Sequence, residues 1–216
     1  MGYIIIDTEG SGLFKHRDPV TKEVIRSDAP GQPRMAEFAA VMLDDRFDII
    51  EEYQSYIQPA GWDHDMPQEA IAIHGLTMDY LWLNGRPVGE ALAYYETAVR
   101  NNNILIGFNQ QHDGRQVRAE LRRAGRDDLF EITPNICAMR SITTNMKGQI
   151  KKLNGKGGFP RLIDAAAHFG IPYEESKRHT ALEDARVTGC LARILHQRGA
   201  LLQAEVHRAA NFGDEA

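Results

Sequence analysis

Two acidic residues stand directly after the first apolar segment of the chain. Residues 3–6 read Tyr-Ile-Ile-Ile, and Asp7 and Glu9 follow with a single residue between them. In an extended strand, residues two apart point to the same face, so the two carboxylates project together. Adjacent anions repel one another unless a cation lies between them. The pair therefore fits either a divalent-metal site or an ordinary surface turn that carries two acids.

Two further carboxylates lie on helices at positions that should face the core. Asp184 shares a stripe of the last predicted helix with Leu191 and Leu195, because these positions fall within about 20° of one line. Asp113 lies in the first turn of a helix that follows an apolar strand, where the ligand sites of α/β sheets collect. A buried carboxylate on either stripe requires a partner or a metal. The alternative is an acid placed favourably at a helix N-terminus.

A histidine precedes the last of these acids. His179 stands five positions before Asp184, so on a single helix the two side chains would lie about 140° apart. Both can address one site only if His179 lies at or before the helix start, which is possible because Thr180 is a suitable N-cap. Histidine exchanges protons near physiological pH, which suits a general base.

The overall composition is that of an ordinary globular protein. The chain has 216 residues, 43% of them hydrophobic and 25% charged, enough for one domain with a sizeable core. No apolar run approaches the roughly 18 residues of a membrane span, and the N-terminus leaves no room for a signal peptide. The two cysteines, Cys137 and Cys190, form neither a metal-type spacing nor a disulfide framework. We therefore expect a protein of the reducing cytoplasm without a membrane partner.

The charge pattern combines a net charge of −5 with two basic segments. The first, residues 114–126, contains five arginines against one glutamate, and the second lies within residues 146–161. A net negative charge argues against attraction of nucleic acid to the whole surface, whereas a local basic segment can hold a polyanion in one groove. Solvated charge on a helix or a loop is an equally good interpretation of each segment.

Hydrophobic periodicity predicts the elements that must position these groups. Uniformly apolar runs are typical of strands buried on both faces, and a spacing of three to four is typical of amphipathic helices. The polar segment over residues 14–33 contains three prolines and predicts a long loop. We expect strands over 3–7, 35–43, 48–57 and 104–108, and helices over 68–101 (with breaks at Gly75, Gly85 and Pro87), 110–124, 162–169 and 180–197. This order indicates an α/β fold with a mixed sheet.

Separated motifs give the chain a resemblance to a known family. Residues 6–9 are Ile-Asp-Thr-Glu with Gly12-Leu13 following, 106–113 are Ile-Gly-Phe-Asn-Gln-Gln-His-Asp, and 179–185 are His-Thr-Ala-Leu-Glu-Asp-Ala. Residues 72–77, Ala-Ile-His-Gly-Leu-Thr, add a shorter likeness. In this order the motifs resemble those of the DnaQ-like, DEDD-type 3′–5′ exonucleases, over about residues 3–197. The resemblance implies an α/β fold with a ribonuclease H-like mixed β-sheet flanked by helices.

The resemblance implies a catalytic group of four acids and one histidine. The tyrosine subclass has a tyrosine where this chain has Thr180, whereas the histidine subclass (DEDDh) has a histidine at the position of His179. The acids would hold two Mg²⁺ (or Mn²⁺) ions that flank the scissile phosphate, since hard cations take oxygen ligands. The histidine would be the general base. The implied catalytic residues are Asp7, Glu9, Asp113, Asp184 and His179, and the four acids are the implied metal ligands.

The chain departs from the family pattern at two places. Ser11 stands where a threonine is usual. Phe108 and His112 exchange the histidine and the phenylalanine that the family has around Asn109. The packing beneath Asp113 and the stacking of bases nearby are therefore expected to differ from the family.

The resemblance also points to residues that would contact the substrate. Leu13 would wedge against the terminal base, and the backbone around Ser11 and Gly12 would meet the 3′-hydroxyl. Lysines of a glycine-bearing segment would grip phosphates upstream, unless that loop is simply solvated. The expected substrate-binding residues are Thr8, Ser11, Gly12, Leu13, His74, Asn109, Lys147, Lys151 and Lys152. For His74, the alternative is a packed core histidine.

Together these features predict a metal-dependent 3′–5′ exonuclease that degrades single-stranded nucleic acid, with DNA favoured, to 5′-mononucleotides. One alternative is an exoribonuclease of the same family that acts on RNA or short oligonucleotides, and another is an inactive module that binds 3′ ends or a partner protein. The expected partners are 3′ ends of single-stranded DNA or RNA and, for a proofreading role, a polymerase or another replication or repair protein. We expect one exonuclease domain over residues 1–200, followed by a C-terminal helical extension or polar tail over 201–216.

Overall fold

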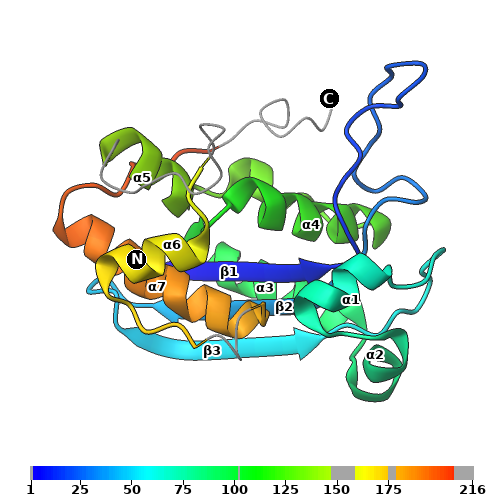
Figure 1. The fold of residues 1–216 in the computed structure, drawn as a ribbon, viewed down its shortest axis with the longest axis horizontal. Helices are drawn as coiled ribbons and strands as arrows, with labels where there is room; N and C mark the ends of the chain where they lie inside the picture. Colours follow the sequence, from blue (N-terminus) through cyan, green and yellow to red (C-terminus); the bar gives the residue numbers. More distant parts are fainter. Residues whose placement is uncertain (1, 102, 147–158, 175–178, 207–216) are drawn as a thin grey trace.

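The computed structural model describes residues 2–101, 103–146, 159–174 and 179–206, which form a layered α/β fold (Figure 1). Its sheet has the strand order β3-β2-β1-β4-β5. β1 lies at the centre, antiparallel to β2 and parallel to β4, so the predicted mixed sheet is confirmed. The strands are β1 (Tyr3–Gly10), β2 (Met35–Leu43), β3 (Ile49–Tyr56), β4 (Ile104–Gly107) and β5 (Asn135–Cys137).

The described helices follow the predicted periodicity closely. The predicted breaks at Gly75, Gly85 and Pro87 separate the first three helices, and Gly75 has the left-handed φ of 75° that ends α1. The helices are α1 (Gln68–His74), α2 (Met78–Asn84), α3 (Val88–Arg100), α4 (Gln110–Arg123), the 3₁₀-helix η1 (Leu129–Ile132), α5 (Ala138–Asn145), α6 (Leu162–Phe169) and α7 (Ala181–Gln197). Among the described residues, no helix combines the length and apolar character needed to cross a membrane.

The central strands of the sheet are buried between two layers of helices (Figure 1). Because side chains alternate along a strand, Ile4 and Ile6 of β1 join the core on the side of α3 and α4. Ile5 joins the core on the side of α7. All three side chains are fully buried, which explains why the first strand is apolar on both faces. The central strand is thereby fixed from both sides, and its carboxyl end has a defined position.

The sequence-based prediction missed three elements, the 3₁₀-helix η1, β5 and α5, and one return of the chain. β5 has only three residues, too few to show a period, and α5 follows it without an intervening loop. Residues 201–206, the described part of the expected helical extension or polar tail, are not helical. They run back along the sheet edge, where Glu205 forms an antiparallel bridge with Asn135.

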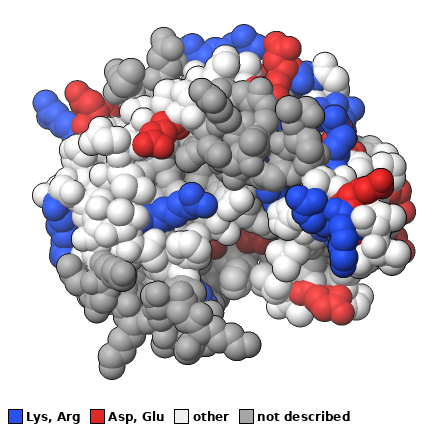
Figure 2. Space-filling model, turned by 90° about the horizontal axis from the view of Figure 1, so that it is seen from above, with Lys and Arg blue, Asp and Glu red and all other residues white. Residues whose placement is uncertain are grey.

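The arginines of residues 114–126 are engaged inside the protein. Arg118 is fully buried, and its Nε lies 2.7 Å from a carboxylate oxygen of Asp128, which Arg122 also contacts. On the face drawn in Figure 2, the described basic side chains lie in separate groups with acidic side chains between them. This favours a structural role for the first basic segment. The other ion pairs of this segment join Arg123 to Glu120 and Arg126 to Glu96.

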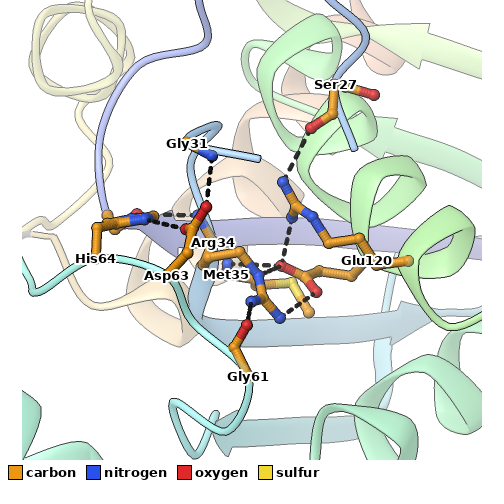
Figure 3. A network of polar contacts seen from close by, with 10 residues as sticks. Ser27, Gly31, Arg34, Met35, Gly61, Asp63, His64 and Glu120 are labelled. Atoms are coloured by element: carbon orange, nitrogen blue, oxygen red, sulfur yellow. Dashed lines mark hydrogen bonds and ion pairs between the residues drawn. The ribbon is translucent and has the colours of Figure 1, made fainter. Parts of the chain in front are cut away.

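Glu120 is the centre of a buried ionic cluster that joins β2 to α4 (Figure 3). Arg34 donates Nε and Nη2 to its two carboxylate oxygens at 2.9 and 3.1 Å, and the Met35 amide and Arg123 also donate to it. The Glu120 side chain is only 2% exposed. Two arginines and one amide therefore depend on a single carboxylate that is shielded from water.

Glu120→Ala should lower the free energy of unfolding by about 3–5 kcal/mol, because it leaves buried cations without their counter-charge. Urea denaturation measures this loss. The control is Glu90→Ala, which removes an exposed ion pair with Arg86 and should cost less than about 1 kcal/mol. Equal losses in the two variants would contradict the structural role given to Glu120.

Candidate active site

Four acids converge at the carboxyl end of β1. Asp7 and Glu9 belong to this strand, Asp113 lies in the first turn of α4, and Asp184 lies in the first turn of α7. β4, which leads into α4, is the parallel neighbour of β1, so the two strands end on the same edge of the sheet. The negative charges of Asp113, Asp184 and Glu9 all act on Asp7. The structure thus brings together the four acids that the sequence singled out.

His179 joins this group from the start of α7. Side-chain ligand atoms of Glu9, His179 and Asp184 all lie within 4.8 Å of one another. His179 has a left-handed φ of 59° and stands just before Thr180, the N-cap of the helix. A left-handed backbone is uncommon for a residue other than glycine and takes His179 out of the helical register. His179 therefore precedes the helix, which is the condition under which its side chain and that of Asp184 can share a site.

The acids repel one another strongly enough to resist ionisation. Burial, followed by the charges of Asp113, Asp184 and Glu9, raises the pKa of Asp7 well above its ordinary value. Burial together with neighbouring charges, that of Asp184 foremost, raises the pKa of Glu9 to about 9. Burial raises the pKa of Asp113 to about 6, although His112 and hydrogen bonds from Thr8 act in the opposite direction. A nearby cation would therefore strongly stabilise the ionised form of these carboxyl groups.

Thr8 holds the Asp113 carboxylate in place. Its amide and its hydroxyl both donate to the same oxygen of Asp113, at 3.1 and 2.9 Å. Thr8 is 5% exposed, so the structure gives it a different contact from the one with substrate that the sequence suggested. It connects the central strand to α4 and fixes one candidate metal ligand.

A fifth acid, Glu37, was missed by the sequence analysis. It lies on β2 directly opposite Glu9 and is 1% exposed. Its carboxylate accepts hydrogen bonds from Gln54 Nε2 at 2.6 Å and from the Ala181 amide at 3.2 Å. Glu37 therefore anchors the start of α7, which carries His179 and Asp184. The signal was present as an acid within the otherwise apolar run of residues 35–43.

Tyr173 was also missed. It lies between α6 and α7, and its hydroxyl donates a short hydrogen bond to the Asp184 carboxylate. No periodic pattern could have indicated this contact, because the segment before α7 is irregular. The phenol hydroxyl restrains the orientation of the Asp184 carboxylate.

A pocket of about 510 Å³ opens beside the acids. One wall is the end of β1 and the turn after it, where Leu13 is 82% exposed and Gly12 has a φ of 147° that other residues rarely adopt. The other wall is α1, which contributes Ala70, Ile73 and His74. The pocket is mostly apolar at its walls and acidic at its Glu9 end. It can therefore hold a flat apolar group next to a cationic or metal-bound one.

The remaining predicted substrate residues lie around this pocket or outside the described part of the chain. Ser11, Gly12, Leu13 and His74 line it, whereas Asn109 is an exposed residue at the start of α4. The predicted lysines, Lys147, Lys151 and Lys152, lie outside the described residues.

The exchanged aromatic residues take different environments. Phe108 is buried in a core cluster with Ala138 and Leu191. His112 lines the pocket, and its ring meets the ring of Phe14 edge-on with centroids 6.4 Å apart. Phe108 thus supplies the packing beneath the site, and His112 presents an imidazole at the pocket wall where the family has a phenylalanine.

The donor set fits hard divalent cations. Within the described residues, Asp7, Glu9 and Asp113 form no ion pair with lysine or arginine. Their charge is thus not balanced by the described part of the chain. Carboxylate oxygens with one imidazole nitrogen are ligands that Mg²⁺ and Mn²⁺ accept.

Comparison with known proteins identifies the family. The exonuclease (RNase T) family profile matches residues 4–191. No curated protein sequence matches the chain.

Solved structures with the same fold include three exonuclease I structures. Escherichia coli exonuclease I in complex with a dA16 oligonucleotide is 20% identical, with a TM-score of 0.71 over 91% of this chain and 41% of that one. The zinc-bound form of the E. coli exonuclease I–single-stranded DNA complex is 21% identical, with a TM-score of 0.71 over 91% and 41%. Exonuclease I of Methylocaldum szegediense is 22% identical, with a TM-score of 0.70 over 91% and 40%.

The chain spans about two fifths of the length of these structures, and the likeness confirms the expected ribonuclease H-like fold. The family profile covers the first strand, both later acidic motifs and most of α7. The chain therefore belongs to the RNase T-type exonuclease family of DnaQ-like proteins.

Proposed function

We propose that this chain is a metal-dependent 3′–5′ exonuclease of the histidine subclass that acts on single-stranded nucleic acid, with DNA favoured. The observation that carries the proposal is the convergence of four carboxylates with His179 at one end of a pocket. Membership of the exonuclease family supports phosphodiester hydrolysis as the reaction.

Asp7, Glu9, Asp113 and Asp184 would hold two Mg²⁺ or Mn²⁺ ions. When bound, such a pair activates a water molecule and stabilises the charge on the leaving oxygen. The protein contributes the placement of the ligands, because Thr8 fixes Asp113 and Tyr173 restrains Asp184.

His179 would accept the proton of the attacking water. It lies on the Glu9 and Asp184 side of the cluster and outside the helix, where its ring can turn toward a nucleophile. The pocket would receive the terminal nucleotide, with its base between Leu13 on one wall and Ile73 on the other. Both side chains are more than half exposed, so a base stacked against them would bury apolar surface.

The preference for DNA rests on the fold likeness to exonuclease I structures, some of which contain single-stranded DNA. The likeness covers about two fifths of those chains, so RNA or short oligonucleotides are the main alternative substrates. An inactive binding module is the other alternative. It is disfavoured because every position that the chemistry requires carries a suitable side chain.

One digestion separates these possibilities. The purified chain is incubated with 3′-blocked and 5′-blocked oligomers of DNA and RNA, with Mg²⁺ or with EDTA, and the products are separated by length. We expect 5′-mononucleotides from substrates with a free 3′ end, only with metal, and faster from DNA. Activity on 3′-blocked or circular substrates would contradict an exonuclease of this polarity, and binding without cleavage would indicate the inactive module.

A further inference from the structure

Two hydrogen bonds connect the opposite walls of the pocket. His74, at the end of α1, contacts the carbonyl oxygen of Gly10 through Nε2 at 3.3 Å. His64, which precedes the same helix, contacts the Ser11 hydroxyl through Nε2 at 2.8 Å. The end of β1 is therefore tied to α1 by His74 and to the segment that leads into α1 by His64. The His74 bond falls within the family-like segment, whereas His64 belongs to none of the family motifs.

The donors and acceptors around His64 form an ordered chain. The Ser11 oxygen accepts the Arg34 amide at 2.9 Å, which leaves its hydroxyl hydrogen for His64 Nε2. His64 Nδ1 lies 2.7 Å from Asp63, whose carboxylate also accepts the Gly31 amide at 2.7 Å (Figure 3). The hydrogen bonds from His64 and Gly31 lower the pKa of Asp63. With the Nδ1 hydrogen directed at Asp63, His64 Nε2 can accept the Ser11 hydroxyl.

Arg34, which directly follows the 14–33 loop, holds the segment that carries His64. Arg34 donates Nη1 to the Gly61 carbonyl at 2.8 Å, and its guanidinium lies 5.8 Å from the centre of the Trp62 ring (Figure 3). Arg34 is in turn fixed by the buried Glu120. The end of the 14–33 loop and the adjacent Arg34 therefore hold residues 61–64 in place.

Serine, histidine and aspartate in hydrogen-bonded order also occur in acyl-transfer enzymes. Here Ser11 is 4% exposed and its oxygen already accepts the Arg34 amide. Its own amide donates to the Arg34 carbonyl at 2.9 Å. Ser11 is thus held from three directions, which suits a structural anchor and does not suit a nucleophile presented to a substrate.

We propose that His64 is a positioning residue that fixes the distance between the two pocket walls and thereby sets the affinity for the terminal nucleotide of a single-stranded nucleic acid. The nucleotide assignment rests on the proposed function. His64 contacts none of the candidate metal ligands or His179, so its effect reaches the substrate through Ser11 and the turn that carries Leu13. Loss of the bond should therefore weaken binding without slowing the chemical step.

The kinetic test compares His64→Ala with Asp65→Asn, a control at an exposed neighbouring residue. His64→Ala should raise KM for a single-stranded oligonucleotide about fivefold to tenfold, the effect of one hydrogen bond, with kcat within about twofold. Binding of thymidine 5′-monophosphate should weaken by a similar factor, and His64→Gln, which returns an acceptor near the position of Nε2, should recover part of the loss. Unchanged KM, or an equal loss of kcat, would overturn the proposal.

Hydrogen exchange on the free protein tests the wall contact without any substrate. In His64→Ala, the amides of residues 11–13 should exchange faster than in the wild type, whereas Asp65→Asn should leave them unchanged. Equal exchange would overturn the positioning role, whatever the protein does with nucleic acids. If exchange rises but the wild type neither binds nor cleaves nucleic acid, the wall contact stands and the proposed function fails.

Discussion

Asp7→Asn should abolish nuclease activity and, at the same time, stabilise the metal-free protein. Asp7 lies on the central strand, and the charges of four other acids, Asp113, Asp184, Glu9 and Glu37, act on it. Asp7 is the best-placed candidate for a ligand shared by both ions, so its loss should lower kcat about a thousandfold or more. Calorimetric titration with Mn²⁺ should show that tight metal binding is lost as well.

The stabilisation follows from the direction of the pKa shifts. Glu9 has an ordinary pKa near 4.5 and a folded-state pKa of about 9. The folded chain therefore binds more protons than the unfolded chain between these values, so stability without metal falls as pH rises through this window. Asp7→Asn replaces a carboxyl group whose pKa is raised in the folded state by a group that does not titrate, and it should raise the free energy of unfolding by about 1–2 kcal/mol at pH 8.

Thermal unfolding with EDTA from pH 5 to pH 9 measures both effects. The melting temperature of the wild type should fall with pH, and Mg²⁺ should restore it. The control Asp45→Asn removes an exposed charge from the β2–β3 turn and should change neither property. An Asp7→Asn variant that is less stable than the wild type in EDTA would show that Asp7 has a structural partner and is not held in an unbalanced cluster.

Much of the fold could be predicted because its elements have local signals. β2 was predicted with its observed bounds, and the three helices over residues 68–100 are separated at the predicted glycines and proline. β5 pairs with β4 about 30 positions earlier in the chain, and residues 201–206 return to pair with β5 some 70 positions away, which no local pattern encodes. The sequence-based prediction therefore missed the elements that depend on long-range pairing.

The candidate site was predictable to a similar extent and for related reasons. Asp113 and Asp184 stand out because a charge on an apolar stripe violates the local pattern. Tyr173 and His64 lie in irregular segments, where no periodicity marks a residue as facing the site. The role of the arginines in residues 114–126 could not be predicted, since their acidic partners Glu96 and Asp128 come from other parts of the chain.

His179→Ala should lower kcat about a hundredfold to ten-thousandfold, the range for loss of a general base. His168→Ala, at an exposed histidine of α6, is the control and should have no effect. The position of His179 leaves a second role to be tested, because its ring nitrogen lies within 4.8 Å of ligand atoms of Glu9 and Asp184. A general base and a metal ligand in this position would both be essential for activity.

Metal titration separates the two roles. If His179 is the base, His179→Ala should bind Mn²⁺ with nearly wild-type affinity in calorimetry, and its activity should lose the acidic limb of the pH profile. If it is a ligand, the variant should bind metal more weakly, and higher metal concentrations should recover part of the activity. Near-wild-type kcat in the variant would remove the imidazole from the chemistry and leave only the four carboxylates.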